Sequence, residues 1–154
     1  MLHPKQFIGF GILVIALVAL LAACGGTPAT MNDIPAMPGA TAVDANIANT
    51  LANNMQQDAA LRQAMGVNGK IEQKGYAVAQ DTTWDQVKAF YGDKLKGAGW
   101  ENNNMVSNIM AQANAANDMY QTEMWKKGNQ TLTVILLKDP VSGDKHLLLS
   151  LASN

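Results

Sequence analysis

The fold is set by residues 120–138, which read YQTEMWKKGNQTLTVILLK. In the first half Gln121, Glu123 and Trp125 fall on one side of an alternating pattern, which has the two-residue period of a β-strand. Gly128-Asn129 is typical of a two-residue hairpin turn, and the apolar run after it predicts a second, more deeply buried strand. The stretch therefore predicts an antiparallel hairpin at the centre of a sheet.

The flanking sequence extends this sheet in both directions. Residues 139–144 contain proline and glycine and favour a turn, and the alternating leucines beyond them predict a strand over 145–153. Upstream, the pattern of residues 71–80 predicts another strand, and a weaker one is expected around 99–106. The Asn-rich stretch 101–118 is an insert, with a loop or a short helix near 107–117.

One strong helix signal lies between these strands. Thr83 and Gln86 have the spacing of a capping box, and lysines and glycines follow where a helix would end. The apolar residues recur at steps of three and four: Trp84, Val87, Tyr91, Leu95 and Ala98. We expect this helix to pack on the sheet face that carries Leu132, Val134 and Leu136.

The sequence before the first strand divides into two parts. Residues 25–43 hold Pro28, Pro35 and Pro38 among small residues, which predicts a flexible spacer. Asp44 is placed to cap a helix over about 45–65. Its apolar stripe is narrow, so this helix needs docking to be stable.

Together these signals predict an α+β fold: an antiparallel sheet of four to five strands, with one main helix packed on a face and an N-terminal helix after the tether. The order is β-α-β-β-β-β, with the Asn-rich insert after the second strand. Ile135, Leu137 and Leu148 point to the second face, which we expect helix 45–65 or the insert to cover at least in part. The alternative for that face is a groove for a partner or a lipid.

The amino terminus has the pattern of an export signal, with Lys5 before the uncharged apolar run of residues 7–23. The run ends in Leu21-Ala22-Ala23-Cys24-Gly25, which resembles the lipobox of bacterial lipoproteins. The resemblance implies cleavage between Ala23 and Cys24 and a diacylglyceryl group on the Cys24 sulfur. Two or three acyl chains anchor a protein stably, so the expected partner is the lipid bilayer, reached through acylated Cys24.

This interpretation predicts four parts: a signal peptide over 1–23, the lipidated cysteine and tether over 24–43, a helical segment over 44–69 and a small α+β domain over 70–154. The protein would lie in the cell envelope, facing outside the cytoplasm. Because the residue after the cysteine is glycine rather than aspartate, the pattern resembles outer-membrane sorting in a cell that has an outer membrane. In other cells the outer face of the cytoplasmic membrane is expected.

The rival hypothesis is an uncleaved signal anchor. An apolar run over residues 7–23 makes about 25 Å of helix, slightly short of a bilayer span.

Composition and motifs argue against several functions. The chain has 11 basic and 12 acidic residues, a formal net charge of −1 and no basic cluster, so nucleic-acid binding is not expected. His3 leaves with the signal, which makes His146 the single histidine of the mature chain. Asp139 and Asp144 lack the spaced oxygen ligands of a calcium loop and indicate a hairpin turn. We find no catalytic constellation, metal site or cofactor motif, so the protein is not predicted to be an enzyme.

The candidate binding surface is the strand face that carries Trp125, Glu123 and Gln121. Trp125 is the best candidate for an exposed aromatic that stacks on a ligand, although cover by the N-terminal helix is the favoured interpretation. The predicted function is a membrane-anchored binding or scaffolding module with an envelope protein partner. The alternative is a ligand-binding or enzymatic lipoprotein that uses the Trp125 face or the second sheet face.

Overall fold

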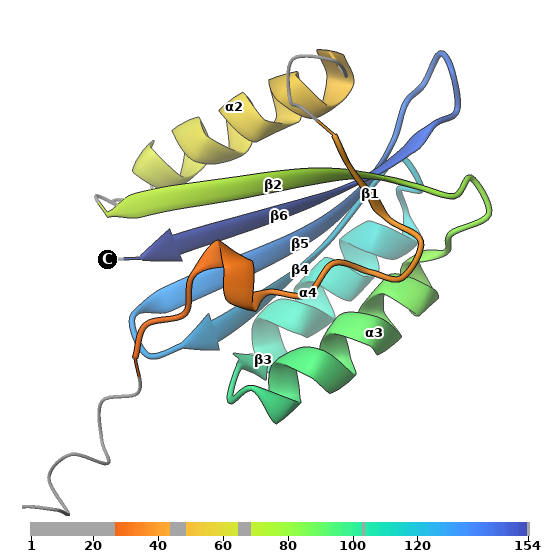
Figure 1. Cartoon of the computed structure of the whole chain (residues 1–154). Coiled ribbons are helices and arrows are strands. Elements are labelled where there is room, and N and C mark those ends of the chain that lie inside the picture. The colour runs from red at the N-terminus through yellow and green to blue at the C-terminus, as the bar shows by residue number, and fades with distance from the viewer. Residues whose placement is uncertain (1–26, 44–48, 65–68, 103, 154) are drawn as a thin grey trace, which may run out of the picture.

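The computed structural model describes residues 27–43, 49–64, 69–102 and 104–153, which form an α+β fold (Figure 1). The elements in chain order are a 3-10 turn η2 (Met31–Asp33), β1 (Thr41–Val43), α2 (Asn49–Ala64), β2 (Lys70–Val78), α3 (Trp84–Gly97), β3 (Glu101–Asn102), α4 (Asn104–Ala115), β4 (Tyr120–Lys127), β5 (Gln130–Lys138) and β6 (Lys145–Ser153).

The strands form one antiparallel sheet in the order β1-β2-β6-β5-β4-β3. The predicted hairpin joins β4 to β5, and Gly128 in its turn has φ +58°, a conformation that glycine adopts without steric cost. The predicted fold class is confirmed, with six described strands instead of four to five. The sixth is the short edge strand β1, which comes from the segment that the sequence assigned to the spacer.

The main core lies between the sheet and α3. Thr83 caps this helix as predicted, with its Oγ1 accepting a hydrogen bond from the Gln86 backbone N–H at 3.3 Å. The apolar face of α3 and the inward leucines and valine of β5 and β6 are almost fully buried together. This confirms the predicted packing of the helix on Leu132, Val134 and Leu136.

The second sheet face carries a smaller core of Ile135, Leu137 and Leu148, with Met55 of α2 packed against it. Figure 1 shows α2 on this face, opposite α3 and α4. A polar contact also fixes the helix, because the fully buried Ser150 donates a hydrogen bond to the Asp58 carboxylate at 2.6 Å. The predicted cover of this face by the N-terminal helix is therefore confirmed for the part that α2 contacts.

The spacer prediction is wrong for the described residues of the segment, 27–43. Met31 and Ile34 are buried in the main core, and the Tyr91 hydroxyl donates a hydrogen bond to the Pro35 carbonyl at 3.2 Å. The segment, orange in Figure 1, then ends in β1, which pairs with β2. The prolines do prevent a helix, but the apolar residues between them add to the core, so the chain docks as irregular backbone.

The Asn-rich insert forms β3 and α4, a two-residue strand and a longer helix than the sequence suggested. Asn114 is the buried residue of α4. Its side-chain amide bonds the backbone of β4 as a neighbouring strand would. The Asn114 Nδ2 donates to the Thr122 carbonyl, and the Thr122 N–H donates to the Asn114 Oδ1, both at 2.9 Å. A side chain thus covers part of the β4 edge that β3 leaves unpaired.

The signal peptide, the cleavage residues Ala23 and Cys24, and residues 44–48 and 65–68 of the 44–69 segment lie outside the described residues. Among the helices that the structure describes, none combines the length and apolarity needed to cross a bilayer.

Candidate functional site

A groove separates α3 from α4 and has strand β4 as its floor. It consists of two adjoining cavities of about 470 Å³ and 590 Å³, which share Lys88, Ser107 and Glu123. The first cavity extends toward Thr82 and Lys138, at the end of the sheet where β5 finishes. A groove that runs along a strand in this way suits an elongated ligand better than a compact one.

The local sequence explains both walls. The apolar face of α3 is committed to the core, and Lys88, one residue after buried Val87, borders the groove. On α4 the lining positions recur at helical spacing, which gives the groove one face of that helix. They are Ser107, Met110, Ala111, Asn114 and Ala115. The opposite face of α4 is exposed, with Met105 at 74% and Ile109 at 65%.

The floor contains all three residues of the predicted binding surface. Gln121 and Glu123 line the first cavity, while Glu123 and Trp125 line the second. They face the same side as Leu132, Val134 and Leu136, which are their partners in β5. The alternating pattern of the strand therefore placed the three residues on one face, and the tertiary structure supplied the two helices that border it.

Trp125 is not an exposed aromatic, since only 3% of its surface reaches solvent. We also expected the N-terminal helix to cover Trp125, and this prediction was wrong. Trp125 belongs to the main core with Trp100, on the α3 side of the sheet, whereas α2 covers the other face. Its indole Nε1 is buried and has no hydrogen-bond partner among the described residues. An unpaired buried donor is unfavourable, so this indole N–H lowers the stability of the fold.

Glu123 places a half-buried carboxyl group on the floor of the groove. Burial raises the pKa of its carboxyl, and three weaker influences oppose the rise: a hydrogen bond from Asn102 and the charges of Lys88 and Lys96. The Asn102 Nδ2 donates to the Glu123 Oε1 at 2.7 Å, and the Asn102 Oδ1 in turn accepts a hydrogen bond from the Ser107 hydroxyl. A half-buried carboxylate held in this way can accept hydrogen bonds from a ligand.

Sequence reasoning missed Lys88, Asn102, Ser107 and Asn114 as groove residues. The signal for Lys88 was present, because it lies on the predicted helix just beyond the apolar stripe. The other three belong to the Asn-rich insert, in which the apolar residues do not recur with a marked period. Their roles depend on α4 lying beside β4, which the local pattern does not specify.

The remaining candidates take structural positions. The Asp139 Oδ1 accepts hydrogen bonds from the backbone N–H groups of Val141 and Ser142, at 2.8 and 2.9 Å, so the predicted turn chemistry is confirmed. His146 lies on the α2 side of the sheet, in register with Leu137. Ser150 is four residues further along the same strand, about 13 Å away, and donates to Asp58.

Within the described ranges, no three His, Cys, Asp or Glu residues gather closely enough to hold a metal ion.

Comparisons of the chain with family models, with curated proteins and with solved structures find no match.

Proposed function

We propose that this protein is a lipid-anchored binding module of the bacterial cell envelope, and that the groove between α3 and α4 receives an extended segment of a partner protein. The anchor follows from the lipobox Leu21-Ala22-Ala23-Cys24. The observation that carries the binding role is the groove itself, with Gln121 and Glu123 on its floor.

The side chains that line the groove are suited to binding a peptide. The lining combines the apolar side chains of Trp84, Met110 and Leu136 with polar and charged side chains, a mixture that suits a peptide segment with both kinds of side chain. The Glu123 carboxylate and the Gln121 amide offer acceptors for backbone N–H groups. The mixture of apolar surface and a few placed polar groups is typical of sites that bind by complementarity.

The anchor is tested first, by intact mass of the protein isolated from bacterial membranes. A chain that begins at Cys24 and carries acyl mass supports the proposal, and Cys24→Ser should abolish that mass. A chain that retains Met1 without acyl groups would establish the signal-anchor hypothesis instead.

The groove is tested by photocrosslinking in cells from two positions. A photoreactive residue in place of Gln121 should give a discrete protein adduct that disappears when Glu123→Lys is added. The matched control replaces the exposed Gln56 on α2, which is on the other side of the sheet. Equal capture from both positions, or none from Gln121, would contradict the peptide groove.

A small molecule bound to the purified protein, detected by native mass spectrometry and lost in the Glu123→Lys variant, would favour the ligand-binding alternative.

A further inference from the structure

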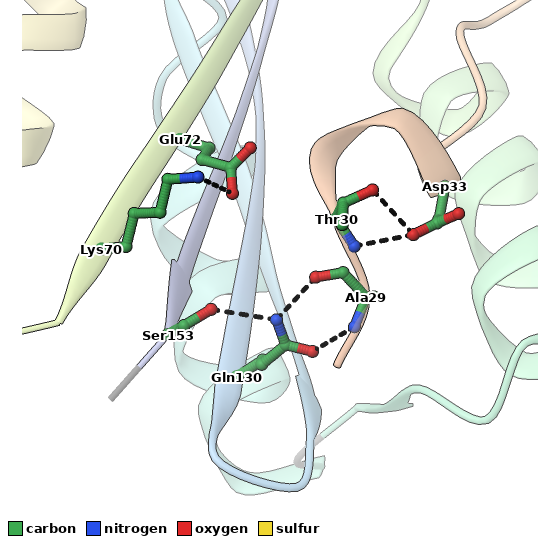
Figure 2. A network of polar contacts seen from close by, with 7 residues as sticks. All are labelled: Ala29, Thr30, Asp33, Lys70, Glu72, Gln130 and Ser153. Atoms are coloured by element: carbon green, nitrogen blue, oxygen red, sulfur yellow. Dashed lines mark hydrogen bonds and ion pairs between the residues drawn. The ribbon is translucent and has the colours of Figure 1, made fainter. Parts of the chain in front are cut away.

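The amide of Gln130 holds the start of the described chain. The Ala29 N–H donates to the Gln130 Oε1 and the Gln130 Nε2 donates to the Ala29 carbonyl, both at 2.8 Å, and the same Nε2 donates to the Ser153 hydroxyl at 2.9 Å (Figure 2). Gln130 is only 2% exposed. We refer to these contacts of Gln130 with Ala29 and Ser153 as the amide clamp.

The chain continues from the clamp directly into the core. The Asp33 carboxylate accepts hydrogen bonds from the Thr30 N–H at 2.7 Å and from the Thr30 hydroxyl at 2.8 Å (Figure 2), which closes the 3-10 turn. Met31, the first residue of that turn, and Ile34, the residue after it, are buried. The backbone from Ala29 onward is therefore part of the folded body and adds no length to a tether.

The clamp lies at one end of the sheet. Gln130 begins β5, and it is in register with Ser153 at the end of β6 and with Lys127 at the end of β4. The C-terminal end of α3 reaches the same place, because the Lys127 Nζ donates to the Ala98 carbonyl at 2.8 Å. We call this surface, with the turn Gly128-Asn129 at its tip, the proximal end.

Cys24 is five residues before Ala29. Fully extended, five residues span at most about 18 Å. The nine residues of β5 place the opposite end of the sheet about 30 Å further away, at the turn Asp139–Asp144. A lipid on Cys24 therefore keeps the proximal end within about 18 Å of a bilayer, whereas the connection does not hold the opposite end there.

We propose that the proximal end faces the phospholipid surface and that the first cavity of the groove lies at the end away from it, an inference that rests on the proposed acylation of Cys24. The second cavity, which Lys96 and Trp100 line, is nearer the proximal end. The first cavity extends to Lys138 and Lys145, which are at the end of the sheet remote from the clamp. A partner would then approach the groove from the envelope space. The orientation is set by the clamp and the short connection, not by a long tether.

The distribution of charge favours the same orientation on an anionic surface. Near the proximal end the described charges are Lys70, Lys94, Lys96, Lys126 and Lys127, against Asp33, Glu72, Asp93 and Glu101. Near the remote end they are Asp81, Asp85, Asp118, Asp139 and Asp144, against Lys88, Lys138 and Lys145. The basic excess thus lies on the side where the connection to Cys24 begins.

The orientation is tested by energy transfer from single dyes to acceptor-labelled lipid in vesicles of phosphatidylcholine and phosphatidylglycerol. The chain has one cysteine, and acylation consumes its thiol. Asn129→Cys and Val141→Cys therefore each give the lipidated protein a single reactive thiol, at the proximal turn and at the remote turn. We expect more efficient transfer from position 129 than from position 141.

The control inserts twenty Gly and Ser residues between Gly26 and Thr27, a flexible coil with an average span of about 25 Å. The insertion should leave the fold intact and remove most of the difference between the two dye positions. Equal transfer from both positions without the insertion, in protein whose acyl mass is verified, would overturn the orientation and leave the proposed function standing. Protein without acyl mass would overturn the proposed function itself.

Discussion

Two side-chain amides form the hydrogen bonds that the backbone of a neighbouring strand would otherwise form. Gln130 bonds both backbone groups of Ala29, and Asn114 bonds both backbone groups of Thr122. Each side chain offers one carbonyl and one NH₂, so it reproduces the donor and acceptor of a neighbouring strand. Both residues are buried, and a shorter side chain at either position would leave backbone groups without partners.

Gln130→Ala should lower the free energy of unfolding by about 2 kcal/mol, because it removes three hydrogen bonds and leaves partly buried polar groups unpaired. Urea unfolding of the Cys24→Ser protein measures this change. Gln112→Ala, at an exposed position of α4, is the control and should change stability by less than about 0.5 kcal/mol. Equal effects of the two substitutions would show that the amide clamp does not stabilise the fold.

Glu123→Gln should stabilise the protein at neutral pH. Burial raises the pKa of Glu123 above its ordinary value of 4.5, so the folded chain binds a proton more readily than the unfolded chain at this carboxyl. Its contribution to the free energy of unfolding then falls as the pH rises from about 4.5 through the folded-state pKa. The amide has no charge to bury, while its oxygen can still accept the Asn102 hydrogen bond.

The measurement is urea unfolding of wild type and variant between about pH 4 and pH 7, where the advantage of Glu123→Gln should grow with pH. Glu101→Gln, on the exposed edge strand β3, is the matched control. An advantage of Glu123→Gln that shrinks toward neutral pH would contradict the burial of this carboxyl.

Among the elements, α4 is held to the sheet by the hydrogen bonds of one buried side chain. Asn114 is its buried residue, whereas the outer face of the helix exposes Met105 and Ile109. A helix with so little buried apolar surface gains little from the hydrophobic effect. Its place beside the groove therefore relies on the hydrogen bonds between Asn114 and Thr122.

Asn114→Ala should release α4 locally while the rest of the sheet stays folded. Hydrogen exchange at the Thr122 amide should accelerate at least about tenfold, which corresponds to a loss of about 1.4 kcal/mol of local stability. Exchange at the central strand β6 should change little. Asn108→Ala, at an exposed position of the same helix, is the control. Unchanged exchange at Thr122 would show that packing alone holds α4.

For the whole molecule, the two central strands and the N-terminal segment define a continuous core. Strands β5 and β6 bury residues on both faces, since α3 and the segment 27–43 cover one face and α2 covers part of the other. Met31 and Ile34 are 3% and 4% exposed, values similar to those of the core leucines. The segment next to the proposed anchor thus contributes to the core of the body that it holds.

The double substitution Met31→Ala and Ile34→Ala should destabilise the protein by about 5 kcal/mol, because each large-to-small change in a core costs about 2–5 kcal/mol. Thermal unfolding of the Cys24→Ser protein checks this, with Met37→Ala, at a half-buried position of the same segment, expected to cost less. A change below about 1 kcal/mol would mean that the segment is a spacer after all.

The local sequence was enough to predict the elements whose side chains recur with a strong period. The alternation through Glu123 and Trp125, the Gly128-Asn129 turn and the apolar face of α3 each predicted its element, and the capping pair of Thr83 and Gln86 predicted where α3 begins. These signals act between residues a few positions apart, where the period of an element appears directly in the order of its side chains.

The sequence by itself determined the α+β class, the four long strands β2, β4, β5 and β6, the main helix and the strand face that bears Gln121 and Glu123. Only the tertiary structure decided that residues 27–43 join the core, that α4 borders a groove, and that Trp125 is buried beneath α3. The physical reason is distance along the chain: Ala29 meets Gln130 after 101 positions. Contacts between such distant residues depend on how the elements pack together, and no local pattern records them.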